Sequence, residues 1–208
     1  QDVWMAILKS QVESGLPYLL FKDHVNHKSA QKNLGCIRSS NLCTEVVLYT
    51  SPDEIAVCNL ASMVLGRYLK GDRFDFERLG EKVKEVVYNL NRVIDVNFYP
   101  VPESRTSNLQ HRPVGIGVQG LADCMARLKM VYGSQEAKDF DRDVFEQIYF
   151  SALEASCELA EKDGAYSSFS GSPASQGLLQ FDLWEKTDEV YEKGRIGSRR
   201  WEEVKEGE

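Results

Sequence analysis

Hydrophobic residues recur at helical spacing in several stretches of the chain. Residues 1–14 and Val144 to Lys162 place apolar side chains three and four positions apart, a pattern typical of amphipathic helices. The clearest predicted helix runs from Phe74 to Val96 and has a wide apolar face. That face consists of Phe76, Leu79, Val83, Val86, Val87, Leu90, Val93 and Ile94. The first predicted helix ends at Gly15-Leu16-Pro17, because glycine and proline after a periodic run stop a helix.

Other apolar stretches favour extended structure. Ser40 to Thr50 alternates and is rich in Val, Leu and Tyr, and Tyr18 to Phe21 is a short apolar run, so both are predicted strands. Glu54 to Leu65 is predicted to start extended and to turn helical after Ala61. Val114 to Leu128 opens with glycines and is predicted to continue as a helix.

Turns and polar loops separate these elements. Ser51-Pro52-Asp53 is a predicted turn, because serine, proline and aspartate each favour turn positions. Glu103 to Arg112 is a predicted polar loop, and Ser167 to Gly177 a predicted Ser/Gly/Pro loop. There is no internal repeat and no linker long enough to divide the chain, so residues 1–208 are expected to form a single segment.

The two ends of the sequence indicate a piece of a longer protein. The chain opens inside a predicted helix, and Trp201 and Val204 lie where the first turns of another helix would be. The acidic stretch 185–208 is otherwise expected to be a solvated helix end or loop. We therefore expect a segment that is incomplete at both ends; a trimmed but complete domain is the alternative.

Composition narrows the function classes. With 25 basic against 32 acidic residues, a net charge of −7, no nucleic-acid surface is expected. No apolar run approaches the roughly 18 residues of a membrane span, so no membrane association is expected. The 5 cysteines are odd in number and no signal-peptide pattern opens the sequence, which argues against a secreted disulfide framework. We expect a cytoplasmic protein whose functional cysteines, if any, are redox-active or catalytic.

The strongest candidate chemistry lies in Ser40 to Glu45. In a strand, Asn41, Cys43 and Glu45 would point to the same face, because side chains alternate. An amide, a thiol and a carboxylate would then lie side by side. A buried carboxylate without a partner is costly, so this face is either a solvent face or an active site. The spacing alone leaves both possibilities open.

A second cysteine follows in Ile55-Ala56-Val57-Cys58-Asn59-Leu60. Its flanks are apolar, and a free cysteine is most often a small buried core residue. However, the Ser-Pro-Asp turn between the two extended segments would also allow Cys58 to lie near the cavity of Cys43. Both interpretations stay open.

Three other patterns suggest weaker sites. Gly115 to Gly120 fits G-x-G-x-x-G, but the preceding segment is polar and does not resemble the strand that a dinucleotide-binding motif needs. His24 and His27 stand beside Asp23 without a further strong metal ligand, so a solvated loop is expected. Nothing in the sequence brings His111 to Cys43 as a nucleophile pair.

Several segments, in order along the chain, together resemble one family. SNLCTE, DEIAVCNLAS, YPVPES, RPVGIGVQGLAD, ALEASCELA and the SP-x-SQG-x-LQ-x-D-x-W stretch are similar to the large, catalytic subunit of class I ribonucleotide reductase, with eukaryote-type members most alike. The resemblance runs from about Gly15 to Trp184. It implies an α/β fold, here part of the family's ten-stranded α/β barrel.

The resemblance implies reduction of ribonucleoside diphosphates to 2′-deoxyribonucleotides by thiyl-radical chemistry. Cys43 matches the cysteine that becomes the thiyl radical and removes the 3′ hydrogen, and Glu45 matches the base that accepts the 3′-hydroxyl proton. Asn41 matches the amide that binds the substrate ribose. Cys58 matches one of two cysteines that supply the reducing equivalents and close to a disulfide.

The resemblance also implies missing parts. The family's other reducing cysteine lies upstream of this segment, and Cys36, Cys124 and Cys157 do not occupy its motif. We expect no cofactor or metal bound by the segment itself. The expected partners are the remaining segments of the large subunit, a radical-generating small subunit with a di-iron or related centre, and a thioredoxin or glutaredoxin system.

Two alternatives to an active catalytic segment follow. The first is a non-catalytic fragment that binds other reductase subunits, because the segment would be inactive without the missing parts. An adenosylcobalamin-dependent reductase, which shares the radical cysteine and its neighbours, is the other.

Overall fold

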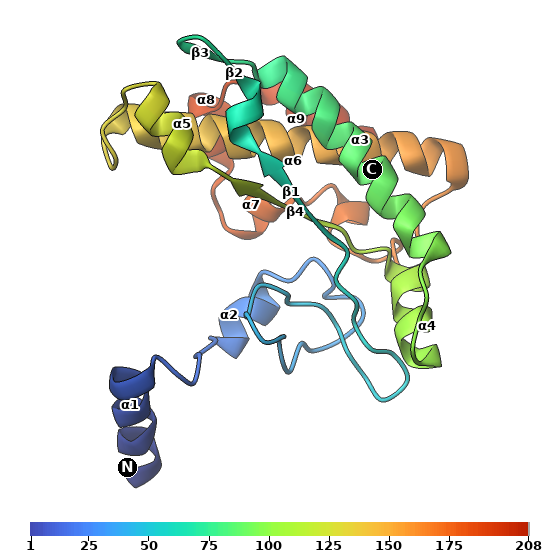
Figure 1. Cartoon of the computed structure of the whole chain (residues 1–208). Helices are drawn as coiled ribbons and strands as arrows, with labels where there is room; N and C mark the ends of the chain where they lie inside the picture. Colours follow the sequence, from blue (N-terminus) through green and yellow to red (C-terminus); the bar gives the residue numbers. More distant parts are fainter. Residues whose placement is uncertain (208) are drawn as a thin grey trace.

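The computed structural model describes residues 1–207, and of residues 187–189 only the backbone. Figure 1 shows helices packed around a short parallel strand pair, with an extended region below them. The helices are α1 (Asp2–Ser14), α2 (Lys22–His27), α3 (Phe76–Val96), α4 (Pro102–His111), α5 (Leu121–Arg127), α6 (Gln135–Asp163), α7 (Gln180–Leu183), α8 (Thr187–Lys193) and α9 (Ser198–Gly207). The strands are β1 (Leu60–Val64), β2 (Leu69–Lys70), β3 (Arg73–Phe74) and β4 (Gly115–Gln119), and short 3-10 turns cover Leu65–Tyr68 and Ala174–Gln176.

Helices α3 and α6 form the centre of the packed region. The side chain of Asp75 accepts a hydrogen bond from the Arg78 N–H at the start of α3, and Ser134 does the same for Ala137 at the start of α6. The predicted helix at 74–96 is confirmed, and the one predicted at 144–162 begins earlier, at Gln135. Their apolar faces enclose the main core: Met63, Leu65, Tyr68, Leu79, Val83, Cys124, Met125, Ala137, Phe140, Val144 and Ile148.

The strands β1 and β4 pair in parallel, with Leu60 opposite Gly115 and Val64 opposite Gln119. The connection between them runs through the short β2–β3 hairpin, α3 and α4, so this part of the chain is a β-α-β unit. The fold class is therefore mixed α/β, as expected. Within residues 1–207 the sheets are two-stranded and none closes, so this segment by itself does not form a ten-stranded barrel.

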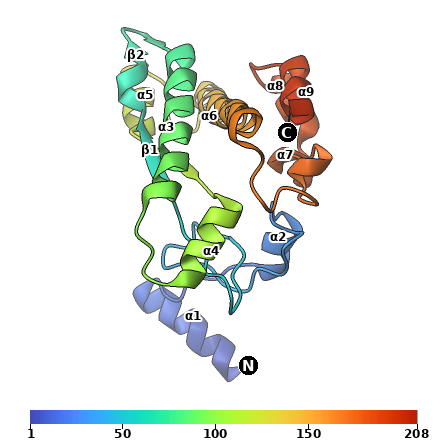
Figure 2. The ribbon, with the colours of Figure 1, turned by 90° about the vertical axis from the view of Figure 1, so that its right-hand side faces the viewer.

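The C-terminal helices pack against α6. Figure 2 shows α6 between α3 on one side and α8 and α9 on the other. Trp201 and Val204 on α9 are buried together with Phe150 and Leu179. The helix predicted at Trp201 is thus confirmed. The prediction that 185–208 is solvated is wrong for α9, because Trp201 and Val204 are buried. Glu208 lies outside the described residues.

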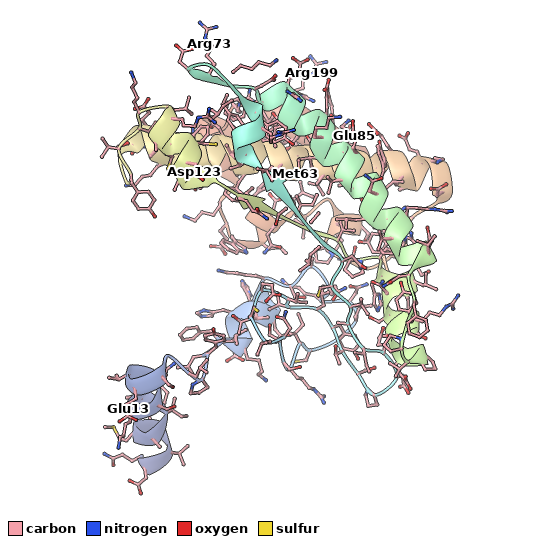
Figure 3. The ribbon with its side chains drawn as sticks, in the orientation of Figure 1. Glu13, Met63, Arg73, Glu85, Asp123 and Arg199 are labelled. Atoms are coloured by element: carbon pink, nitrogen blue, oxygen red, sulfur yellow. The ribbon has the colours of Figure 1, made fainter. Side chains whose placement is uncertain are left out.

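Residues 1–59, here called the N-terminal arm, have few buried side chains. Among them only Ser29, Ile37 and Asn59 are buried, and α1 contributes none. Figure 3 shows the contrast: Met63 lies on β1 amid the packed helices, and Glu13 lies on α1, far from them. The predicted first helix is confirmed and ends at Ser14; Gly15 caps it with a φ of 75°, the left-handed conformation that glycine tolerates.

Several sequence-based predictions of secondary structure are wrong. Tyr18–Phe21 forms no strand, and its side chains are exposed without a partner strand among the described residues. The stretch after Ala61 continues as β1 rather than turning helical, because it pairs with β4. Glu103–Arg112 is not a loop: α4 occupies it, and Pro102 at the first helical position suits a helix start because proline has no N–H to leave unpaired.

Two predictions of turns and loops are confirmed. The turn at Ser51-Pro52-Asp53 is confirmed by a hydrogen bond from the Ser51 N–H to the Glu54 carbonyl, 2.9 Å long. The loop predicted at 167–177 is irregular apart from the 3-10 turn at its end. No helix within residues 1–207 is long and apolar enough to cross a membrane.

Candidate active site

The segment that carries Asn41, Cys43 and Glu45 is a tight turn and not the predicted strand. The Thr44 N–H donates to the Asn41 carbonyl at 3.2 Å, which closes a turn with Cys43 in its centre. Thr44 has a φ of 64°, a conformation that a β-branched residue rarely adopts. The alternation of faces expected from a strand therefore does not apply here.

The turn nevertheless brings two of the three candidates together. The Asn41 Nδ2 donates to Glu45 Oε1 at 2.5 Å, and Asn41 Oδ1 accepts from the Val46 N–H at 3.2 Å. Ser40 Oγ donates to the Val46 carbonyl at 2.5 Å. The amide of Asn41 thus holds both the Glu45 carboxylate and the backbone beyond it, because it uses its donor and its acceptor at once.

The thiol of Cys43 is exposed at the centre of this turn, and Asn41 and Glu45 are exposed beside it. A carboxylate oriented by an amide, in a turn that also exposes a thiol, provides the groups that proton and hydrogen transfer need. The three residues do not line the cavity that lies between α3, α6 and the loop 163–169.

Cys58 lies in the chain that leads into β1, and it too is exposed and free. The core interpretation is wrong for this residue; burial falls instead on the next side chain, Asn59. The buried cysteine of the described chain is Cys124, where desolvation raises the thiol pKa.

The weaker candidates do not become sites. Gly115 and Gly117 lie inside β4, and only Gly120 lies in the turn between β4 and α5. The first two glycines therefore do not form the strand-to-helix turn of a dinucleotide-binding motif. His24 stacks on Phe21, with ring centroids 5.7 Å apart, and no cluster of metal-ligating side chains is found in residues 1–207.

The structure gives His111 partners other than Cys43. Its Nε2 lies 2.5 Å from Glu54 Oε2, and its Nδ1 lies 2.8 Å from Ser168 Oγ. The sequence analysis missed this group, since its members lie 57 positions apart along the chain on either side of His111. A histidine in a stretch predicted to be a polar loop gave no signal that it would be buried.

Comparison with known proteins gives the family. A family model described as the ribonucleotide reductase barrel domain matches residues 1–207. The chain is 58% identical over 184 residues to the ribonucleoside-diphosphate reductase large chain of Schizosaccharomyces pombe, covering 88% of this chain and 23% of that protein. It is 61% identical over 186 residues to the large subunit of Trypanosoma brucei brucei (89% and 22%), and 55% identical over 182 residues to that of vaccinia virus (88% and 24%).

The chain thus spans less than a quarter of the length of these relatives, with 22% to 24% of each covered. The family match extends over nearly the whole chain, including the turn at Cys43 and the chain around Cys58. This chain belongs to the ribonucleotide reductase barrel-domain family.

Proposed function

We propose that this chain is a segment of the catalytic subunit of a ribonucleoside-diphosphate reductase and supplies part of its active site. The observation that carries the proposal is the Asn41–Glu45 hydrogen bond across the turn that presents Cys43. It joins two of the three side chains that the reaction needs, and the third, Cys43, lies between them in the sequence. Because the chain covers less than a quarter of its relatives, we expect activity only in the complete enzyme.

The strand pair supports a place in a larger barrel of ten strands. Parallel sheets are normally covered on both faces and continue beyond two strands. Here Leu60 and Val64 on β1 are 55% and 50% exposed, which is costly for apolar strand residues. We propose that the remaining strands come from the parts of the subunit beyond residues 1–208.

The first chemical step assigns a role to each residue of the turn. The Cys43 sulfur, oxidised to a thiyl radical by the partner subunit, takes the hydrogen atom from C3′ of the ribose and becomes a thiol. Glu45 accepts the proton of the 3′-hydroxyl as a general base, with its carboxylate held by Asn41. Asn41 also contacts the substrate ribose in this proposal.

The second step uses Cys58. The 2′-hydroxyl leaves as water, and two thiols supply two electrons and two protons while they join as a disulfide. The balance is one ribonucleotide and two thiols on one side, and one deoxyribonucleotide, one water and one disulfide on the other. Cys58 is one thiol, and the second is a cysteine of the subunit outside this segment. Cys43 returns its hydrogen to C3′ at the end.

The proposal includes the cellular setting. The radical comes from a small subunit with a di-iron or related centre, and a thioredoxin or glutaredoxin system reduces the disulfide. The substrate is a ribonucleoside diphosphate, and the enzyme works in the cytoplasm. The segment itself needs no bound cofactor for the steps given to its residues.

The direct test replaces Cys43 by serine in the complete large subunit, assayed with its small subunit. We expect Cys43→Ser to abolish deoxynucleotide formation, because the O–H bond of serine is too strong to be converted to a radical in place of the thiol. Chromatography of the nucleotide products measures this, with Cys36→Ser as the matched control. Multi-turnover activity in Cys43→Ser would refute the proposal. Dependence on adenosylcobalamin instead of the small subunit would identify the alternative enzyme class.

Cys58→Ser tests the second role. We expect this variant to begin the reaction and consume substrate, yet to yield little deoxynucleotide, because the second reducing thiol lacks its partner. Unchanged turnover with a thiol reductant would remove Cys58 from the mechanism.

A further inference from the structure

The chain around Cys58 is held by α4 at three points. The segment Glu54 to Asn59, here called the Cys58 segment, lies alongside α4 on its way into β1 (Figure 1). From this arrangement we propose that His111 on α4 is a positioning residue that fixes the Cys58 thiol for the reducing step. The inference rests on the proposed function, and it concerns residues to which the sequence pattern gave no role.

His111 holds the start of the Cys58 segment. Its side chain is 2% exposed, and Nε2 lies 2.5 Å from the Glu54 carboxylate. A carboxylate only accepts hydrogen bonds, so Nε2 carries the hydrogen; in the neutral ring Nδ1 then accepts from Ser168 Oγ at 2.8 Å. Both ring nitrogens are therefore used, and the ring cannot rotate without breaking a buried hydrogen bond.

Asn59 holds the other end of the segment. Its Nδ2 donates to Asn108 Oδ1 at 2.7 Å and to the Pro113 carbonyl at 2.8 Å. Asn108 is fully buried, and its own Nδ2 donates to the Tyr99 hydroxyl at 2.6 Å. The Gly115 N–H completes the anchor with a 2.9 Å bond to the Asn59 carbonyl.

A third contact lies between these two ends. The Ile55 N–H donates to the Glu103 carbonyl in the first turn of α4, at 3.1 Å. Glu103, Asn108 and His111 all belong to α4, so one rigid helix fixes both ends of the segment while the thiol between them stays exposed. Because both ends of the segment are hydrogen-bonded to α4, the motion of the Cys58 thiol is restricted although the reacting atom stays exposed.

His111 also connects the Cys58 segment to an earlier part of the N-terminal arm. The loop of Ser168 receives two hydrogen bonds from Asn33 Nδ2, at 2.9 Å to the Ser168 carbonyl and 3.3 Å to the Ser170 carbonyl. Asn33 belongs to the arm that carries Cys43. Through Ser168, His111 therefore joins the Cys58 segment to the part of the arm around Asn33.

A positioning role makes a different prediction from a purely structural one. If His111 only stabilised the fold, its loss would slow every step of the reaction alike. If it fixes Cys58, the hydrogen abstraction at Cys43 continues while the reducing thiol is misplaced. A 3′ radical that meets no thiol at C2′ decays to other products, so substrate disappears without deoxynucleotide. The ratio of deoxynucleotide formed to substrate consumed separates the two roles.

The experiment uses the complete large subunit with its small subunit and a dithiol reductant. We expect His111→Ala to lower the product-to-substrate ratio by roughly tenfold or more, since a displacement of about 1 Å in a reacting group costs up to about a hundredfold in rate. His111→Gln, whose amide offers one donor and one acceptor, should restore most of the ratio. His27→Ala is the matched control, because His27 lies exposed on α2.

A second variant covers the case in which His111→Ala does not fold. Glu54→Ala removes the partner of Nε2 at a partly exposed position and should lower the same ratio. An unchanged ratio in both folded variants, with or without a lower overall rate, would overturn the inference. The wild-type assay is separate: if wild-type enzyme forms no deoxynucleotide, or Cys43→Ser stays active, it is the proposed function that fails.

Discussion

The α3–α6 core and the N-terminal arm are built by different means. The core contains Leu79, Val83 and Val144, all fully buried, on helices whose apolar residues repeat every three to four positions. The arm has few buried side chains and little regular structure between α2 and β1. Its contacts with the rest of the chain include polar bonds, such as Asn33 to the Ser168 carbonyl and Gln180 Nε2 to the Lys28 carbonyl.

The core is stable through its own packing, whereas the arm that carries the proposed chemistry depends on contacts with distant parts of the chain. The core holds itself together because its helices bury apolar surface against each other. The arm presents Cys43 and Glu45 but buries little, so its geometry depends on polar contacts with α4 and the loop 167–177. Mutations in the core should therefore change stability, and mutations at the contacts of the arm should change chemistry or local order first.

The largest expected effect is loss of a core side chain. Leu79→Ala removes a fully buried leucine between α3 and its neighbours and should lower the free energy of unfolding by about 2–5 kcal/mol, the transfer and cavity cost of such a truncation. Urea unfolding followed by circular dichroism measures it.

The matched control for that variant lies in the arm. Val12 on α1 is 89% exposed, so Val12→Ala should change the free energy of unfolding by less than about 0.5 kcal/mol. Equal losses in the two variants would contradict the contrast between core and arm.

The sequence predicts the core well for the same reason that the core is stable. The apolar period of 74–96 specifies both the helix and the face that it buries. At 103–112 the period is missing, because α4 buries polar side chains instead: Ser104, Ser107, Asn108 and His111. A helix that is held by hydrogen bonds through its own polar residues looks like a loop in a hydropathy pattern.

The candidate site was predictable in its residues and not in its shape. Asn41, Cys43 and Glu45 were found by their spacing and by family resemblance, yet a turn with a left-handed Thr44 replaces the expected strand. Local alternation cannot anticipate that Asn41 satisfies Val46 and Glu45 by a turn of its own. The clamp on the Cys58 segment was invisible because its partners are distant in sequence.

An intermediate effect is expected at the junction between the two regions. Asn108→Ala leaves the buried amide of Asn59 without one of its partners and should cost about 1–3 kcal/mol, the penalty of an unsatisfied buried polar group. Hydrogen exchange should also rise at the Gly115 N–H, which bonds the Asn59 carbonyl. Asn97→Ala, at an exposed asparagine after α3, is the control; a similar loss in both would mean that Asn108 acts only through its place near the end of a helix.

The smallest expected effect lies on the outer surface of the core, where side chains of α3 and α6 form salt bridges. Lys84 Nζ lies 2.8 Å from Glu158 Oε1, and the Tyr88 hydroxyl donates to the other Glu158 oxygen. These two hydrogen bonds, that of Lys84 first, hold the pKa of the Glu158 carboxyl below its usual value of 4.5. The Glu158 side chain is 47% exposed, so solvent weakens the gain, and Tyr88→Phe should cost less than about 1 kcal/mol at pH 7.

The sign of the pH dependence follows from the lowered pKa of Glu158. A carboxyl with a lower pKa in the folded state stabilises the fold above its unfolded pKa, and that stabilisation disappears as the pH falls through the folded pKa. The difference in unfolding free energy between wild type and Tyr88→Phe should therefore be constant near neutral pH and shrink below about pH 4.5. Unfolding at pH 7, 5 and 3 measures it, with Tyr18→Phe at an exposed tyrosine of the arm as the control. A difference that persists unchanged at pH 3 would mean that the hydroxyl of Tyr88 contributes through packing and not through the charged carboxylate. The outer surface of the core would then be stabilised by packing, as its interior is, and not by polar contacts, as the arm is.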